Sequence, residues 1–232
     1  MKFSLVIPCF NEAASLLILL ERCKEVAASP GVEIILVDNG STDSTAELLR
    51  NLLPQYPGCR SIRIEKNQGY GFGIVSGLRA AKGESLGWTH ADMQTDPQDI
   101  FIGLELFKKH GGDIFVKGRR YGRPLLDVIF TVGMSVYETL LLARPMWDIN
   151  AQPTMFSRGF FESWSVPPDD FSLDLYAYYL AKNCDLKVHR FPVRFGDRAH
   201  GISHWNVNWA AKQKFIRRTV EFSIQLKKKI SK

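Results

Sequence analysis

Cysteine is scarce in this chain of 232 residues, and its four cysteines stand far apart, at Cys9, Cys23, Cys59 and Cys184. They form neither a CxxC pair nor another spacing typical of metal ligands, which disfavours a zinc site and a disulfide framework. We therefore expect a reducing, cytoplasmic setting.

Long apolar runs are also lacking, and we expect none to reach the roughly 18–20 residues that cross a bilayer. The N-terminal stretch, Lys2 followed by the apolar Phe3–Ile7, resembles the start of a signal peptide. However, Pro8, Asn11 and Glu12 interrupt the apolar residues, and no small-residue cleavage site follows. We interpret it as a buried strand. Internal repeats, low-complexity linkers and nucleic-acid-binding motifs are absent as well, so no nucleic-acid partner is expected.

The charge is unevenly distributed. The formal net charge is +6, and many of the basic residues gather near the end of the sequence: Lys212, Lys214, Arg217, Arg218, Lys227, Lys228, Lys229 and Lys232. Two interpretations stay open. The cluster is either a solvated helix face and tail, or a surface that faces anionic lipid headgroups and gives peripheral membrane contact.

Strand and helix patterns alternate in the first half, which predicts an α/β fold with a mainly parallel sheet. The predicted strands are Phe3–Ile7, Glu33–Val37, Ser61–Glu65, Glu84–Trp88 and Asp113–Lys117, and the predicted helices are 11–27, Thr45–Leu53, Gly73–Ala81 and 97–109. Ser41 or Thr42 is expected to cap the second helix, with Asp43 in its first turn.

The second half is more apolar and richer in proline. Leu125–Leu142 is either an interfacial amphipathic segment or a core-packing helix. Further predictions are a helix over Asp170–Lys182, a strand over Leu186–Phe195 and a long basic helix over Trp205–Lys229. We expect one domain over 1–232, with a nucleotide-binding half (about 1–117) and an acceptor half (about 118–232).

Polar or glycine-rich loops follow each of the first four predicted strands. These loops are 8–12, 38–43, 67–73 and 88–97. In parallel α/β sheets, ligands bind beyond the carboxyl ends of the strands. Each loop by itself is also compatible with a cap or a turn, but four such loops at one sheet edge predict a ligand site.

The residue types in these loops suggest a chemistry. Asp92 and Gln94 offer the oxygen ligands that Mg²⁺ or Mn²⁺ prefers, and such a cation neutralises a diphosphate leaving group. Asp38 and Glu12 can accept hydrogen bonds from a base or a ribose. The glycines of 69–73 let the backbone approach a ligand closely.

Four segments resemble the successive signatures of the family 2 inverting glycosyltransferases, which have the GT-A fold, a Rossmann-like nucleotide-binding sandwich. The segments are Val6–Glu12, Leu36–Asp43, Asn67–Gly69 and Asp92–Gln94. In the second half, 118–121, 150–153, 171–174, 191–193 and 198–205 resemble the acceptor-side motifs of the dolichyl- or polyprenyl-phosphate mannose and glucose synthase branch.

The resemblance implies a UDP- or GDP-sugar donor, a lipid-phosphate or glycan acceptor, and Mg²⁺ or Mn²⁺ as cofactor. The implied donor-binding residues are Pro8, Phe10, Glu12, Asp38, Ser41, Asn67, Gly69 and Asp92. Metal binding falls to Asp92 and Gln94, with His90 as a further candidate ligand. The implied acceptor- or phosphate-binding residues are Arg120, Gln152, Arg198 and Ser203, and the implied catalytic residues are Asp92, Arg198 and Asp174.

Three positions depart from the family pattern. His90 replaces an acid of the metal loop, Asn39 replaces a common aspartate, and Asp127 stands near the place where the synthase branch tends to carry an arginine. A phosphate acceptor is already anionic and needs no base, whereas a hydroxyl acceptor requires one. Asp174 is then the first candidate base and Asp170 the second.

Two other functions remain as alternatives. One is a non-catalytic nucleotide- or glycan-binding module in which His90 marks a decayed metal site. The other is an NAD-dependent oxidoreductase, because Gly69-x-Gly71-x-Gly73 follows a strand and Asp92 lies about twenty residues further on. Its glycine spacing is not that of the dinucleotide fingerprint, however.

Overall fold

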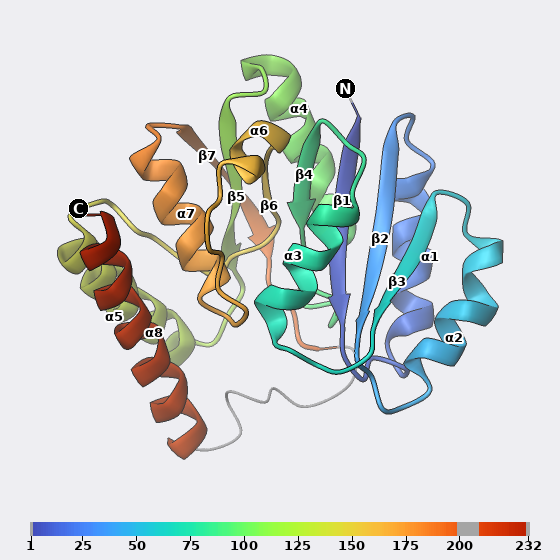
Figure 1. Cartoon of the computed structure of the whole chain (residues 1–232), viewed down its shortest axis with the longest axis horizontal. Helices are drawn as coiled ribbons and strands as arrows, with labels where there is room; N and C mark the ends of the chain where they lie inside the picture. Colours follow the sequence, from blue (N-terminus) through green and yellow to red (C-terminus); the bar gives the residue numbers. More distant parts are fainter. Residues whose placement is uncertain (1, 199–208, 231–232) are drawn as a thin grey trace.

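The computed structural model describes residues 2–198 and 209–230, which are built around one mixed β-sheet (Figure 1). Its strands are β1 (Phe3–Cys9), β2 (Val32–Asn39), β3 (Cys59–Ile64), β4 (Ser85–Trp88), β5 (Ile114–Tyr121), β6 (Thr154–Ser157) and β7 (Lys187–Arg194). They are ordered β3-β2-β1-β4-β6-β5-β7, and β6 runs antiparallel to both of its neighbours while the other pairs are parallel. The prediction of a mainly parallel α/β sheet is confirmed.

Helices cover both faces of this sheet. They are α1 (Leu16–Ala27), α2 (Thr45–Leu52), α3 (Tyr70–Ala80), α4 (Ile100–His110), α5 (Leu125–Leu142), α6 (Arg158–Glu162), α7 (Leu173–Asn183) and α8 (Trp209–Ile230), with short 3₁₀ turns at Leu53–Gln55 and Pro97–Asp99. Side chains alternate between the two faces of a strand, so Val6 of β1 joins one hydrophobic core while Leu5 and Ile7 join the other. Burial on both faces explains why β1 reads as an almost continuous apolar run.

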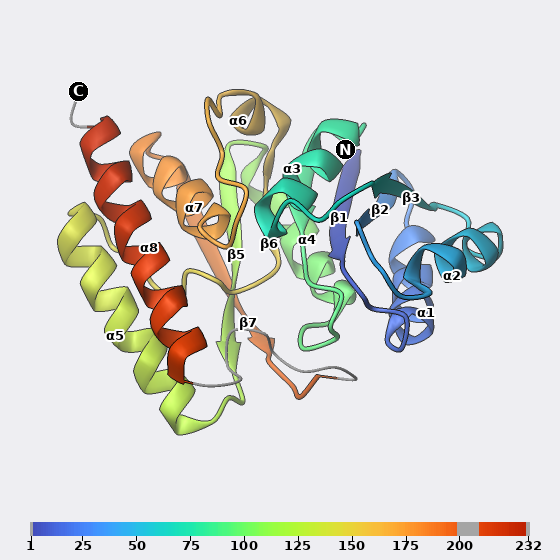
Figure 2. The same cartoon turned by 60° about the horizontal axis from the view of Figure 1, so that its bottom comes forward.

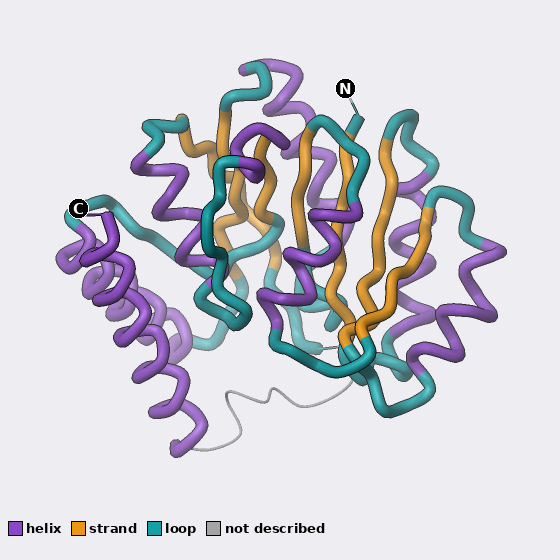
Figure 3. The backbone as a smooth tube through the Cα atoms, in the orientation of Figure 1, coloured by secondary structure: helices purple, strands orange, loops and turns teal. Residues whose placement is uncertain are grey.

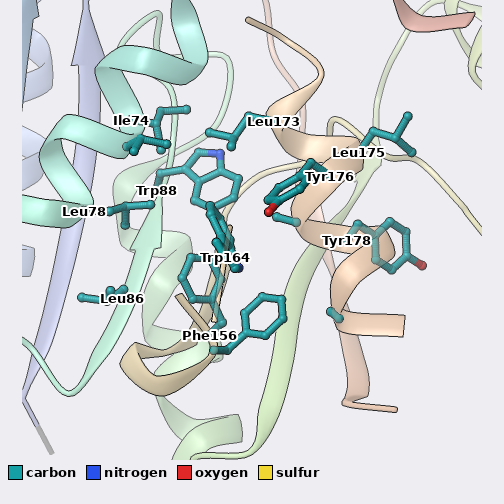
Figure 4. Packing of buried hydrophobic residues seen from close by; sticks show 14 of the residues in the cluster. Ile74, Leu78, Leu86, Trp88, Phe156, Trp164, Leu173, Leu175, Tyr176 and Tyr178 are labelled. Carbon is teal, nitrogen blue, oxygen red and sulfur yellow. The ribbon is translucent and has the colours of Figure 1, made fainter. Parts of the chain in front are cut away.

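An aromatic cluster fixes the strand that carries the acidic loop (Figure 4). The Trp88 ring at the end of β4 meets Phe156 of β6 and Trp164 at centroid distances of 5.5 Å and 6.4 Å, both in edge-to-face geometry. Trp164 in turn meets Tyr176 of α7 edge to face at 5.5 Å. Such pairs add to the stability that burial of the rings already provides. They therefore anchor the chain immediately before the acidic loop.

The first two helices begin differently from our prediction. α1 begins at Leu16 rather than at Asn11, because Asn11 has a positive φ of 57° and its side-chain oxygen accepts a hydrogen bond from the Thr42 backbone N–H. The expected caps of α2 are wrong as well. The N-cap residue is Ser44, without a side-chain cap, and Asp43 Oδ1 accepts the hydrogen bond from the Thr45 N–H.

Two elements of the second half were not predicted, the strand β6 and the short helix α6. β6 has only four residues and lies in the proline-rich stretch after Leu142. It is held by pairing with β4 on one side and β5 on the other. Such a strand is determined by its neighbours in the sheet rather than by a pattern in its own residues.

Helix α5 is largely exposed, in contrast to a core-packing helix. Figure 2 shows α5 beside α8, away from the sheet, and only 17% of α5 is buried. Leu125, Leu126 and Leu140 are each more than 70% exposed. By length and composition alone, this helix is long and apolar enough to cross a membrane. The expectation that no apolar run reaches that length is therefore wrong, because Asp127 and Glu138 are its only charges.

A buried carboxyl group joins α5 to α8. The Ser223 hydroxyl of α8 donates a 2.7 Å hydrogen bond to Glu138 Oε1 of α5, and both side chains are fully buried. The second oxygen, Glu138 Oε2, has no hydrogen-bond partner among the described residues. Burial raises the pKa of Glu138 from its usual 4.5 to about 7. Burial therefore favours the protonated carboxyl group, whereas the hydrogen bond from Ser223 favours the ionised one and opposes the shift.

Because the pKa of Glu138 is higher in the folded state, its contribution to stability is present below pH 4.5 and is lost as the pH rises to 7. We expect Glu138→Gln to raise the free energy of unfolding at pH 8 by about 1–3 kcal/mol and to have much less effect at pH 4.5. Urea unfolding at both pH values measures this. The exposed Glu221→Gln is the matched control, and an equal effect of the two variants would contradict the assignment.

Candidate active site

The loops after β1, β2, β3 and β4 meet at the carboxyl ends of the strands (Figure 3). Residues of these loops line a cavity of about 460 Å³. Many residues predicted for the site line it: Pro8, Phe10, Glu12, Asn67, Gly69, His90, Asp92, Gln94, Arg120, Asp174 and Arg198. The structure thus brings together residues from both halves of the sequence. Asp38, Ser41 and Gln152 do not line the cavity, and Ser203 lies outside the described residues.

Asp38 and Ser41 hold the first two loops in place. Asp38 Oδ1 accepts a hydrogen bond from the Ser41 backbone N–H at 3.0 Å, and its other oxygen pairs with Arg63 of β3. The Ser41 hydroxyl accepts a hydrogen bond from the Asn11 backbone N–H at 3.0 Å. These contacts link the loops after β1 and β2, and they shape the cavity wall that Phe10 forms.

The acidic loop is clamped to the segment after β7. Asp92 Oδ1 accepts a 3.1 Å hydrogen bond from the Gln94 N–H, which closes a tight turn. The Gln94 backbone oxygen accepts the Gly196 N–H at 2.9 Å, and its side-chain amide donates to the Gly196 carbonyl at 3.2 Å. Two residues further on, Arg198 Nη2 lies 3.0 Å from Asp92 Oδ2. The loop is thereby tied to a guanidinium that faces the Asp92 carboxylate.

Excess negative charge gathers beside Asp92. Burial, and next the negative charge of Asp92, raise the pKa of Glu12 from 4.5 to about 7, while the Arg198 charge opposes the shift. Glu12 and Asp92 together thus carry more negative charge than Arg198 alone can balance. Among the described residues no group of three or more His, Cys, Asp or Glu could hold a metal ion. A divalent cation at this place would have Asp92 as its carboxylate ligand and would depend on substrate phosphates for others, a mode that Mg²⁺ often uses.

His90 is engaged by an aromatic neighbour. The Tyr70 hydroxyl lies 3.0 Å from His90 Nε2, and the Tyr70 ring stacks on Phe171 with centroids 4.6 Å apart. Burial lowers the pKa of His90, which favours the neutral ring, although Asp92 opposes this shift. Tyr70 thus engages one ring nitrogen of His90, which lines the cavity, and a metal-ligand role for His90 stays a prediction.

The glycines after β3 pack against protein backbone. A Cβ atom on Gly69 would lie 2.3 Å from the Asp169 carbonyl oxygen, and one on Gly71 would lie 2.3 Å from that of Pro168. Gly73 faces the Asn39 side chain. Positions 69 and 71 therefore need glycine, because a side chain there would collide with the backbone of the 168–170 segment. The geometry therefore provides no dinucleotide cradle, which weighs against the NAD alternative.

Arg120 is bound within the protein. Its Nε and Nη2 both donate to Asp148 Oδ1, and its backbone N–H donates to Asp148 Oδ2 at 2.9 Å. Arg190 provides a second positive charge 3.9 Å from the same carboxylate. Asp148 is 28 residues away from Arg120 in sequence, so this pairing could not be predicted. The guanidinium expected to contact a phosphate is thus already paired.

Arg123, by contrast, was not predicted and also lines the cavity. Its Nη2 donates to the Thr131 hydroxyl at 2.9 Å, and its guanidinium carbon lies 5.9 Å from the centre of the Phe195 ring. Its Nε is buried without a hydrogen-bond partner among the described residues. Asp127, in the first turn of α5, also lines the cavity. The sequence feature that could have indicated Arg123 as a site residue is its position just after the strand β5.

Asp174 lies at the start of α7 and is only 1% exposed. Its Oδ1 accepts a 2.6 Å hydrogen bond from the Gln152 amide and lies 3.6 Å from the ammonium of Lys117. Gln152 therefore reaches the cavity only through Asp174. Asp170, the second candidate base, does not line the cavity, and its Oδ1 accepts the Ser172 N–H instead.

The chain matches the family model described as "Glycosyl transferase family 2" over residues 4–153. This match spans more than half of the sequence, so the chain belongs to glycosyl transferase family 2. It is 34% identical to a dolichol-phosphate mannosyltransferase of Pyrococcus furiosus, over 88% of this chain and 59% of that protein. It is 41% identical to an undecaprenyl-phosphate 4-deoxy-4-formamido-L-arabinose transferase of Edwardsiella ictaluri, over 42% of this chain and 31% of that one. The chain thus spans less than two thirds of either relative.

Solved structures confirm the GT-A fold. Glucosyl-3-phosphoglycerate synthase from Mycobacterium tuberculosis, in complex with UDP, superposes with a TM-score of 0.71 at 18% identity, over 97% of this chain and 79% of that one. A mannosyltransferase from Pyrobaculum calidifontis, in complex with GDP-mannose and Mn²⁺, superposes with a TM-score of 0.66 at 19% identity, over 93% of this chain and 64% of that one.

Proposed function

We propose that this protein transfers a sugar, with inversion, from a UDP- or GDP-sugar to a polyprenyl phosphate. The observation that carries this proposal is the cavity itself. One end is the acidic loop with Asp92, and the other is the face of α5 that carries Phe130 and Met134. A charged end suits a nucleoside diphosphate, and an apolar helix beside it suits a lipid. The relatives named for undecaprenyl and dolichol phosphates support the acceptor class.

At the donor end, the loop after β1 would receive the nucleoside, with Glu12 as the hydrogen-bond acceptor. Asp38 and Ser41 act by fixing that loop. Mg²⁺ or Mn²⁺, held by Asp92 and Gln94, would supply positive charge against the leaving diphosphate. The Mn²⁺ in complexes of related folds supports this cofactor class. Arg198 contributes a second positive charge to the diphosphate as the bond to the sugar breaks.

The transfer itself needs little proton chemistry. An oxygen of the acceptor phosphate, already anionic at neutral pH, attacks the anomeric carbon from the face opposite the diphosphate. The new carbon–oxygen bond forms as the old one breaks, which inverts the configuration. The Asp174 carboxylate would accept a hydrogen bond from a sugar hydroxyl. With a glycan hydroxyl as acceptor, Asp174 would take the proton instead.

At the acceptor end, Arg123 is the better candidate for the phosphate. Arg120 is held by Asp148 through its Nε and Nη2, whereas Nε of Arg123 is buried without a hydrogen-bond partner among the described residues. A guanidinium can bind two phosphate oxygens at once. We therefore assign Arg123 to the acceptor phosphate and give Arg120 the task of holding the end of β5 against Asp148.

The central experiment is a thermal-shift assay with UDP, GDP and NAD, each with and without Mn²⁺. We expect a nucleoside diphosphate to raise the melting temperature, and to raise it more when Mn²⁺ is present. Asp92→Asn should remove the Mn²⁺-dependent part, whereas the exposed Asp113→Asn should not. A response that ignores Mn²⁺ would favour a binding module, and a preference for NAD would favour an oxidoreductase.

The acceptor assignment is tested with single arginine variants. Arg123→Gln should raise the KM for a polyprenyl phosphate by about 10–100-fold, the range for losing a charge-assisted hydrogen bond, and leave the nucleotide-induced thermal shift unchanged. The exposed Arg119→Gln is the control. An unchanged acceptor KM in Arg123→Gln would refute the assignment.

Peripheral membrane contact through α5 is tested by flotation with anionic liposomes at low salt. The exposed leucines of α5, with basic residues such as Arg217 and Lys228 on the adjacent α8, suit an anionic lipid surface. We expect the protein to co-float, and the double variant Leu126→Glu with Leu140→Glu to co-float several-fold less. Leu17→Glu changes an exposed leucine on α1 and serves as control. Equal flotation of the wild type, the double variant and Leu17→Glu would contradict docking through α5.

A further inference from the structure

Lys117 is a fully buried lysine on β5, the strand between β6 and the edge strand β7. It lies on β5, directly after the buried apolar residues Ile114–Val116. Its ammonium donates hydrogen bonds to the Ala151 carbonyl at 2.8 Å and to the Thr154 hydroxyl at 2.9 Å. A buried ammonium is costly unless it is paired. An apolar residue would fill the same space without this cost, so the charge requires an explanation.

The partner of that charge is Asp174, whose Oδ1 lies 3.6 Å from Lys117 Nζ. The same oxygen accepts the 2.6 Å hydrogen bond from Gln152. Asp174 is therefore held by an ammonium and an amide while it lines the cavity. The charge of Asp174 also acts on Tyr70, whose pKa is raised first by burial and then by that carboxylate. Lys117 itself does not line the cavity.

We propose that Lys117 is a positioning residue that holds the Asp174 carboxylate oriented toward the substrate sugar. The proposal rests on the glycosyl transfer proposed above and deepens it. A neutral residue at position 117 would leave the Asp174 charge buried beside an amide alone. Reorientation of the carboxyl group would then remove the acceptor that a sugar hydroxyl requires.

Other charged or titratable groups surround Lys117 and Asp174. The groups that act on Lys117 or lie near Asp174 come from several elements: Arg120 of β5, Asp148 before β6, Arg190 of β7, Tyr70 of α3 and His90 after β4. Burial lowers the pKa of Lys117 to about 8, although the Asp174 charge opposes this shift. Lys117 therefore carries its proton at neutral pH and loses it as the pH rises above 8.

The test compares the pH dependence of kcat in three proteins. The wild type should lose activity as the pH rises through about 8. Lys117→Arg keeps its charge to higher pH, so its activity should persist there. Lys117→Met should lose about tenfold or more in kcat at every pH. An activity decline near pH 8 that stays in place in Lys117→Arg, or full activity of Lys117→Met, would overturn the proposal.

Binding and stability measurements separate this proposal from the proposed function. The thermal shift with nucleoside diphosphate and Mn²⁺ should survive in Lys117→Met, and its absence from the wild type would instead count against the proposed function. Unfolding of Lys117→Met, Asp174→Asn and the double variant forms a cycle. The double variant should be more stable than the sum of the single effects predicts, and additivity would contradict the pairing. Lys187→Met, at an exposed lysine on β7, is the control.

Discussion

The site depends on one buried carboxylate at the end of β4. Asp92 is only 6% exposed, and a buried negative charge must have a positive partner. In this structure Arg198 is that partner. The negative charge of Asp92 also raises the pKa of Glu12, which means that the two carboxylates repel each other. An additional positive charge beside them would reduce this repulsion. The need of Asp92 for a positive partner also underlies the proposed function. There a divalent cation would bind Asp92, and Arg198 would bind the diphosphate instead. Arg198 and the cation would thus alternate as partners of one group.

In the proposed function, the first half of the chain binds the donor at one side of the cavity and the second half binds the acceptor at the other. The sheet and its loops place the charged end, and aromatic packing around Trp88 keeps that end rigid. Phe130 and Met134 of α5 provide the apolar side of the cavity, and α5 is joined to α8 through Glu138 and Ser223. The proposed lipid acceptor would account for the exposure of α5, since an apolar face of this size is costly in water.

Much of the site could be predicted from the sequence because parallel strands place their carboxyl ends at one edge. The loops after β1 to β4 meet there as expected, and His90, Asp92 and Gln94 line the cavity. Pairings between distant residues could not be predicted. Nothing in the pattern around Arg120 indicates that Asp148 neutralises it, and a lysine inside a strand gives no sign of its partner on α7. β6 was missed for the same reason, because its sheet neighbours determine it.

The most direct test is a crystal structure with Mn²⁺ and a nucleoside diphosphate bound together. The account predicts that Mn²⁺ lies against Asp92 and that Arg198 has moved from Asp92 to the diphosphate. It also predicts that the nucleoside lies against the loop after β1, beside Glu12. A structure in which both ligands bind elsewhere, with the Arg198–Asp92 ion pair intact, would contradict the central claim.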